Sequence, residues 1–275
     1  MTFWERLDHV DVRIFYLIIT VLVVFPMIKP LGLPIPISEQ TKKSYEAIEQ
    51  NIKPGDLVFL GVDLNPGQEA ELYPQLVVVG RHLADKGARI VMTNMISGGF
   101  RYEARFVEIL KEQYGMEHGK DFLCLPFQAG TEAAFEGIVQ DLKGLYKVDM
   151  YGEPLDKHPL WNEINSVHDF KMYVEIGDAP IWWLRPMSKV SGLLLWNGTV
   201  ASGASTMAPL FQSGQMCGFI VGMTGGAEYE TLTGYTGSAT AGMDSQSLGH
   251  ALIVLFVILG NVGHFAMRRN AAKTT

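Results

Sequence analysis

Polar side chains and glycines follow several short apolar runs along the middle of the sequence. Such runs are typical of buried strands in a parallel sheet, whose carboxyl ends meet at one edge where ligands bind. A helix that begins at this edge offers free N–H groups to an anion. The sequence therefore predicts a small-ligand site with these residues: Asp63, Asn65, Asn94, Gly98, Gly99, Gln128 and Asp178.

The same residue types also have a purely structural interpretation. Asn, Asp, Ser and Gly are common caps and turn residues between strands and helices, so each position can serve folding alone. Glu175 and Asp178 form an acidic pair near one strand end, but a pair by itself does not define a metal site. Whether this edge is a site or a set of caps stays open. Further polar residues follow the last two apolar runs: Asn197, Thr199, Thr224 and Glu228.

No cofactor and no metal site is predicted. The sequence lacks both the GxGxxG pattern of dinucleotide-binding turns and the GxxxxGK[ST] pattern of phosphate loops. The histidines of the central region lie far apart, and neither they nor the two cysteines have zinc-ligand spacing. Among them, His82 is expected to be a surface or packing residue, and His118, His158 and His168 have no assigned role.

Two short stretches combine glycine-rich turns with a serine. Residues 62–67 read VDLNPG, and residues 96–100, after a predicted helix and strand, read ISGGF. This arrangement resembles signal peptide peptidase A, a membrane-anchored family of serine peptidases. The resemblance implies that Ser97 is a nucleophile with a lysine base, and that N–H groups near Gly67 form the oxyanion hole. No matching motif places the lysine; the available ones are Lys143, Lys147 and Lys189.

Six apolar runs alternate with amphipathic helical patterns through the middle of the chain. The runs cover residues 57–64, 88–95, 121–127, 170–176, 193–196 and 216–223. Ser38, Asn65 and Thr131 stand where capping residues begin helices. Strands that alternate with helices indicate βαβ units. We therefore expect residues 38–233 to form a three-layer α/β domain with a mainly parallel sheet, flanked by two transmembrane helices.

The transmembrane helices are expected because the apolar excess lies at the two ends of the chain. Residues 14–28 carry no charge and continue into a Pro-rich exit to residue 37, and residues 248–267 contain no Asp, Glu, Lys or Arg. A membrane helix needs about 20 apolar residues. Two spans are thus predicted, within residues 14–37 and over residues 248–267, with a Gly-rich linker at 234–247. Buried core helices are the alternative for both, and a signal peptide for the first.

Charge predicts the topology and excludes some classes of partner. The 13-residue N-terminal tail and the C-terminal tail at 268–275 contain Arg or Lys, so both termini are expected in the cytoplasm of a bacterial inner membrane, with the α/β domain outside. Lys29 opposes this topology, because it is a basic residue on the side of the membrane that is expected to be outside. The net charge of −7 excludes nucleic acid as the main partner. A hydrophobic fraction of 48% excludes disorder, and two cysteines exclude a disulfide scaffold.

Three longer stretches carry a second resemblance. They are residues 55–72, 208–230 and 242–263, beginning GDLVFLGVD, APLFQSGQM and GMDSQSLGH. Together they resemble an uncharacterised bacterial family of two-helix membrane-anchored α/β proteins, and this resemblance implies no activity.

Our leading hypothesis is a non-enzymatic integral membrane protein that interacts with the lipid bilayer. Its α/β domain would build a homo-oligomer or a subunit of a larger membrane assembly. The second span supports this, because His250, His264, Asn261 and small residues share one helix face that suits helix packing. The alternatives are a membrane-tethered serine hydrolase with Ser97 as nucleophile, and a receptor-like domain for a small anion.

Overall fold

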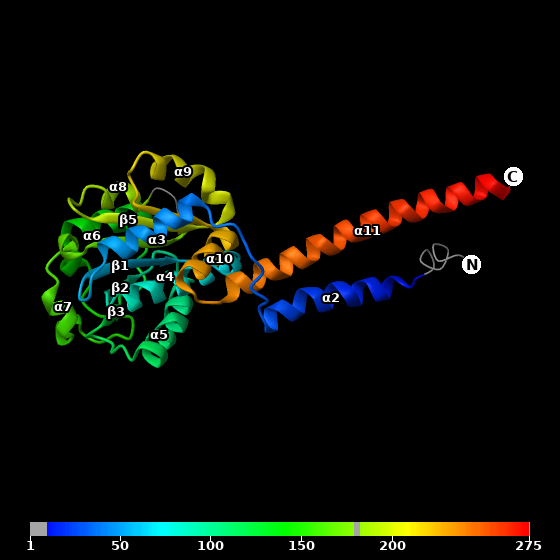
Figure 1. Cartoon of the computed structure of the whole chain (residues 1–275). Helices are drawn as coiled ribbons and strands as arrows, with labels where there is room; N and C mark the ends of the chain where they lie inside the picture. Colours follow the sequence, from blue (N-terminus) through cyan, green and yellow to red (C-terminus); the bar gives the residue numbers. More distant parts are fainter. Residues whose placement is uncertain (1–9, 179–181, 275) are drawn as a thin grey trace. The chain divides into compact units, whose positions relative to one another are not determined.

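The computed structural model describes residues 10–178 and 182–274, with side chains up to Met267, and divides the chain into two compact units. One unit is Ile35–Ala239; the other consists of the residues up to Pro34 and from Thr240 onward. The first unit contains a sheet with helices on both faces (Figure 1). The predicted α/β class is confirmed.

The sheet has six strands in the order β3-β2-β1-β4-β5-β6, and every pairing is parallel. The order reverses between β1 and β4, which lie next to each other in the centre. The strands are β1 Leu57–Asp63, β2 Arg89–Thr93, β3 Phe122–Cys124, β4 Met172–Gly177, β5 Leu194–Thr199 and β6 Gly218–Val221.

Two helical layers bury the central strands from both sides. All seven residues of β1 are buried, which explains why its sequence is nearly continuously apolar instead of alternating. One layer consists of α3 Glu39–Asn51, α4 Glu69–Asp85, α5 Phe100–Tyr114 and α10 Gly222–Thr233. The other consists of α6 Thr131–Leu145, α7 Pro159–Glu163, α8 Leu184–Met187 and α9 Ala204–Gln212. Three short 3-10 helices are η1 Leu155–Lys157, η2 Val167–Asp169 and η3 Ala201–Gly203.

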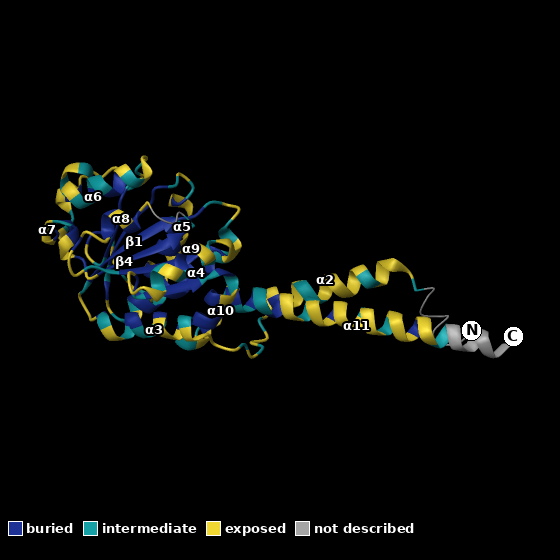
Figure 2. Cartoon of the chain, turned by 90° about the horizontal axis from the view of Figure 1, so that it is seen from above, coloured by how far each residue is buried: buried dark blue, intermediate teal, exposed yellow. Residues whose placement is uncertain are grey.

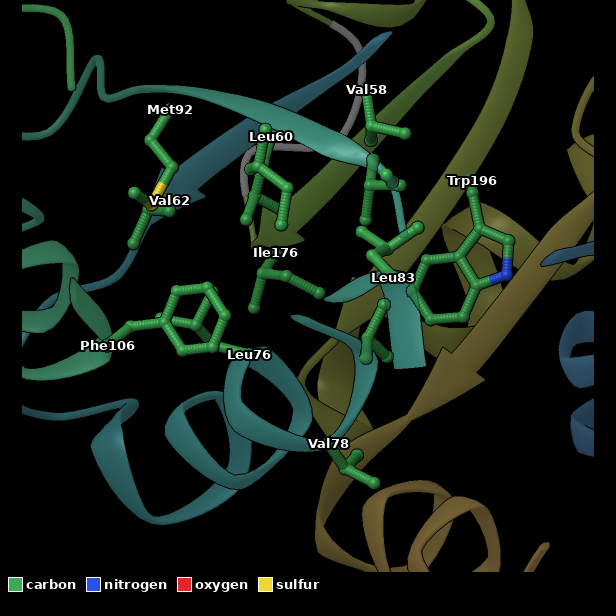
Figure 3. Packing of buried hydrophobic residues seen from close by; sticks show 14 of the residues in the cluster. Val58, Leu60, Val62, Leu76, Val78, Leu83, Met92, Phe106, Ile176 and Trp196 are labelled. Atoms are coloured by element: carbon green, nitrogen blue, oxygen red, sulfur yellow. The ribbon is translucent and has the colours of Figure 1, made fainter. Parts of the chain in front are cut away.

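The core beneath the first layer contains aliphatic side chains from β1 and α4, together with Met92, Ile176 and Trp196 from three other strands (Figure 3). Val58, Leu60 and Val62 point to this face because alternate strand residues share a side of the sheet. They pack with Leu76 and Phe106, which are fully buried. The opposite face of β1 carries Phe59, Gly61 and Asp63, so it becomes polar toward its carboxyl end.

Only some of the helices begin at a residue whose side chain caps the helix. The Ser38 hydroxyl accepts a hydrogen bond from the Thr41 N–H at 3.2 Å, as expected for the N-cap of α3. The predicted caps Thr131 and Asn65 are wrong. Gly130 is the N-cap of α6, and Gln68 is the N-cap of α4, which begins only at Glu69; neither makes a side-chain cap. The residues after Asp178 at 179–181 lie outside the described residues.

The second unit is formed by two apolar helices, α2 Val12–Ile28 and α11 Ser238–Thr274, of which α11 starts within the first unit. Figure 2 shows most of both helices as exposed, whereas the strands are buried. Residues 238–267 are long and apolar enough to cross a membrane. Helix α2 has 17 residues, about 25 Å at 1.5 Å per residue, so the first span stays a prediction.

A buried carboxylate joins the two helices of this second unit. Asp244 of α11 accepts hydrogen bonds from the backbone N–H groups of Leu31, Gly32 and Leu33 at 2.7–2.9 Å. The Ser245 hydroxyl donates to the Val23 carbonyl of α2 at 2.8 Å. The residues after α2 therefore serve as N–H donors that hold the base of α11.

The predicted Gly-rich linker at 234–247 is largely helical, because α11 begins at Ser238. The Glu230 carboxylate accepts hydrogen bonds from the N–H groups of Gly237 and Ala239 at 3.0 and 3.1 Å. These bonds satisfy donors that a helix start leaves free, and the negative charge favours the helix N-terminus. The Glu230 side chain thus compensates for the weak helix propensity of the Gly, Ser and Thr residues that begin α11.

Candidate functional site

The carboxyl ends of β1 and β4 meet at the point where the strand order reverses. Asp63 and Gly177, the last residues of these strands, are paired in register. In parallel α/β sheets the helical connections leave such a point in opposite directions and open a crevice that commonly binds ligands. This edge is therefore where a site is expected from topology alone.

A row of polar residues crosses one face of the sheet near this edge. Thr93, Gly61, Glu175 and Asn197 are aligned across β2, β1, β4 and β5 by the register of the strands. All four are buried. One step further along, Asp63 and Thr199 lie on the same face, because every second strand residue does. The fold thus places polar groups of four strands beneath the α6–α9 layer.

Gly61 makes room for the Glu175 carboxyl group. A Cβ atom added at Gly61 would collide with Glu175 Oε2 and the Tyr173 hydroxyl, and would lie 3.1 Å from Glu175 Cδ. The Tyr173 hydroxyl donates a hydrogen bond to Glu175 Oε2. The acidic side chain consequently lies across β1, beside Asp63, instead of pointing to solvent.

Asp63 and Glu175 have different proton affinities despite their proximity. Burial raises the pKa of Asp63 to about 6, an increase limited by hydrogen bonds from the Met95 N–H, the Glu175 carboxyl group and the Ile96 N–H. Burial raises the pKa of Glu175 well above its usual value, and the Asp63 charge raises it further. Two adjacent buried carboxyl groups cannot both ionise easily. Glu175 is therefore the proton holder of the pair and Asp63 the carboxylate.

Several buried atoms of this face have no hydrogen-bond partner among the described residues. They are Asn197 Oδ1, Thr199 Oγ1 and, from the adjoining Trp183, Nε1. The Asn197 amide nitrogen, by contrast, donates to the Glu175 carbonyl at 3.1 Å. Leaving a buried polar atom unpaired costs about 1–3 kcal/mol. Such a group of atoms can bind a hydrogen-bonding ligand, and Glu175 and Asp63 can donate and accept its protons.

A second buried acid lies on the other face, at the start of α5. Glu103 is fully buried, and burial raises its pKa to about 8. The adjacent Asn94 side chain lowers this pKa and the Asp63 charge raises it. Glu103 is accordingly a neutral acid at pH 7 beneath the turn that contains the two predicted glycines.

At the outer end of the site, Gln68 joins α4 to β4. Its side-chain amide donates to Asp178 Oδ2 at 3.0 Å, and its Oε1 accepts from the Asn65 N–H at 3.3 Å. Asn65 Oδ1 accepts from the Gly67 N–H at 2.9 Å. Asn65 is thus a turn residue, whereas Asp178 is half-buried and near Thr199, since an added Cβ at Gly203 would contact both side chains.

The remaining predicted ligand residues do not all lie at one place. Asn94 is buried beside Glu103, but the half-buried Gln128 side chain turns to its neighbour and donates to the Ala129 carbonyl. The Gly99 N–H donates to the Ile96 carbonyl at 2.8 Å and is used within the turn. Gly98 lies in the same turn, next to the Leu64 carbonyl. The structure therefore divides the predicted ligand residues. Asp63 and Asp178 lie at the carboxyl end of β4, Asn94 lies at the glycine turn with Glu103 on the other face, and the Gln128 side chain points away from both groups.

Ser97 is exposed in the turn before α5 and has no hydrogen-bonded base among the described residues. The three lysines available from sequence are engaged elsewhere. Lys147 donates to the Lys143 carbonyl, Lys189 pairs with Glu136 at 2.6 Å, and Lys143 lies over the Trp161 ring. The hypothesis of a serine nucleophile stays a prediction without a base.

Sequence reasoning missed Glu103 and interpreted His82 only in part. Glu103 lies on the same helical stripe as the buried apolar residues Val107 and Leu110 of α5, so an acid on an apolar stripe was the available signal. His82 is a packing residue, buried at 3% exposure between the Tyr229 hydroxyl at 2.8 Å and the Glu49 carboxylate at 3.0 Å.

In comparisons with known proteins, no family model, curated protein or solved structure matches the chain. Both resemblances seen in the sequence therefore stay predictions. What the chain does has to be argued from its own site.

Proposed function

We propose that this protein is a membrane-anchored α/β domain that binds a small molecule at the carboxyl ends of β1, β4 and β5. The observation that carries the proposal is that the buried oxygens Asn197 Oδ1 and Thr199 Oγ1 have no partner among the described residues. Their position at the reversal of strand order adds support, since ligands favour this place in parallel sheets.

The charges of the site indicate the ligand class. Asp63, Glu175 and Asp178 contribute carboxyl groups, and Asn197 and Thr199 contribute free acceptor oxygens. These groups favour a neutral or cationic molecule rich in hydrogen-bond donors, such as a polyol or an amine. The glycine turns alone predicted an anion, which the neighbouring carboxylates would repel.

The first test uses Thr199→Val, which removes the hydroxyl at nearly constant volume. Because Oγ1 is unpaired, the unliganded variant is expected to gain about 1 kcal/mol in the free energy of unfolding. It should lose the increase in Tm that a bound polyol or amine gives the wild type. Thermal unfolding with a panel of polyols, amines, phosphate and sulfate measures both effects.

Thr93→Val is the matched control for this test. The Thr93 hydroxyl is paired with the Tyr146 hydroxyl at 3.0 Å, so its loss should lower stability by about 1 kcal/mol and spare ligand binding. A Thr199→Val protein that is less stable than wild type, or that keeps the full ligand response, would contradict the proposal.

A second candidate function is the non-enzymatic assembly subunit predicted from sequence. On α11, Gly260 lines an apolar hollow together with Ile14 and Phe15 of α2, and an added Cβ at Gly260 would meet nothing within 4 Å, so this hollow has room for a further helix. Small residues allow two membrane helices to approach closely. The domain would then be outside the cytoplasm and α11 would carry the subunit contacts within the membrane.

For this second candidate, Gly260→Leu is expected to reduce the mass of the detergent-solubilised particle, because a leucine would separate the packed helices. Light scattering or native mass measurement reads the change. Val254→Leu, at an exposed apolar position of the same helix, is the control. A wild-type monomer under mild detergent would end the hypothesis of an oligomer.

A further inference from the structure

Three side chains that are far apart in sequence converge beside β3, the edge strand of the sheet. His118 lies between α5 and β3, Asp149 follows α6, and His158 follows η1. One ligand-type atom of each lies within 4.8 Å of the other two. This cluster is separate in sequence and in its residues from the acidic site at β1 and β4.

The distances within the cluster are those of ligands around one ion. His118 Nε2 lies 3.6 Å and His158 Nε2 3.3 Å from Asp149 Oδ2. Ligand atoms at about 2.05 Å from a tetrahedral zinc ion are separated from one another by about 3.3–3.4 Å. Both contacts to Asp149 are therefore close to the separation that a shared ion would impose.

Buried unpaired atoms form the centre of the cluster. Asp149 Oδ2, His118 Nε2 and His158 Nε2 have no hydrogen-bond partner within the part of the chain that the structure describes, although the Asp149 side chain is only 1% exposed. The other carboxylate oxygen is held in place, because Asp149 Oδ1 accepts the N–H groups of Tyr151 at 2.9 Å and Glu153 at 2.8 Å. Such support orients a metal-binding carboxylate.

We propose that His118 Nε2, Asp149 Oδ2 and His158 Nε2 bind one Zn²⁺ ion. Two imidazoles and one carboxylate are typical zinc ligands, and they are poor for Ca²⁺ or Mg²⁺, which prefer oxygen. Three protein ligands leave a fourth tetrahedral position for water. The imidazole side chains are 18% and 15% exposed, which gives the ion a path from solvent.

The ion would hold the irregular segment at residues 146–158, between α6 and α7, against the edge strand β3. Within this segment, the Met150 N–H donates to the Cys124 carbonyl of β3 at 2.8 Å, and Val148 and Pro154 form an isolated bridge. Because His118 precedes β3 and the other two ligands belong to the segment, one ion joins both. Covering an edge strand also prevents its pairing with another chain.

The test titrates Zn²⁺ into the full-length protein in detergent after EDTA treatment and desalting, in competition with a chromophoric chelator. One Zn²⁺ per chain is expected, together with a rise in Tm of the wild type. His118→Ala and His158→Ala should each weaken binding by at least ~100-fold and remove the rise in Tm. His168→Ala, at an exposed histidine outside the cluster, should bind like the wild type.

Circular dichroism of the metal-free variants separates loss of the ion from loss of the fold. The two histidine variants alter partly exposed rings and leave the Asp149 backbone contacts in place, so they are expected to fold without metal. Binding of Zn²⁺ by either histidine variant as tightly as by the wild type would overturn the proposal. So would a wild type that does not compete with the chelator, or one that prefers Ca²⁺ or Mg²⁺.

Discussion

Gly99→Ala is expected to destabilise the α/β domain by about 3 kcal/mol. An added Cβ at Gly99 would collide with the Val62 carbonyl oxygen of β1 and lie 2.8 Å from Asn94 Cβ. The obstacle is backbone of the central strand, which cannot rotate away as a flexible side chain can. Overpacking of this kind typically costs about 1–3 kcal/mol, and here the strand itself must shift.

The neighbouring Gly98 is the matched control. An added Cβ there would lie 3.3 Å from the Leu64 carbonyl oxygen, so Gly98→Ala should cost less than about 1 kcal/mol. Urea unfolding followed by tryptophan fluorescence measures both variants. Equal stability of the two variants would contradict this prediction, because it would mean that the turn has room for a Cβ atom at Gly99.

Glu103→Gln is expected to make the protein more stable at high pH. The pKa of Glu103 is about 8 in the folded protein and about 4.5 in the unfolded chain, so the folded state keeps a proton that the unfolded state has lost. This group therefore lowers stability as pH rises from about 4.5 to 8. At 1.36 kcal/mol per pKa unit the full loss is about 5 kcal/mol, which a glutamine does not undergo.

The measurement compares the free energies of unfolding of Glu103→Gln and wild type at pH 5 and pH 9. The two proteins should be nearly equal at pH 5, and the variant should be more stable by several kcal/mol at pH 9. Glu108→Gln, at an exposed position of the same helix, controls for the loss of charge. A variant that is less stable at both pH values would show that Glu103 is ionised and paired in the folded state.

The class of fold and many element boundaries follow from the sequence alone. The apolar run at residues 57–64 predicted β1, which ends at Asp63, because a strand buried on both faces needs apolar residues at nearly every position. The lengths of the intervening helical patterns required parallel strands, since a crossover helix returns the chain to the same edge. Both properties are local, and periodicity over ten to fifteen residues suffices to recognise them.

The sequence predicted that the candidate site lies at the carboxyl edge of the sheet. It did not predict which residues of that edge are neighbours. Asp63, Asn94 and Asp178 were expected at the carboxyl ends of strands, yet the contact between Asp63 and Glu175 depends on β4 pairing with β1 in one register. No local pattern specifies which strand crosses over to which neighbour. The helical start of α11 is a similar case, because Glu230 supplies its N-terminal hydrogen bonds.

The sequence by itself determined the α/β class, the apolar ends and the residue types at strand ends, because these depend on side-chain periodicity and turn chemistry along the chain. Tertiary structure decided which two acids form a buried pair, which glycine lies against the backbone of another strand and which histidines converge. His118, Asp149 and His158 become neighbours only when the segment after α6 lies along β3. Their meeting depends on long-range packing, which spacing in the sequence does not record.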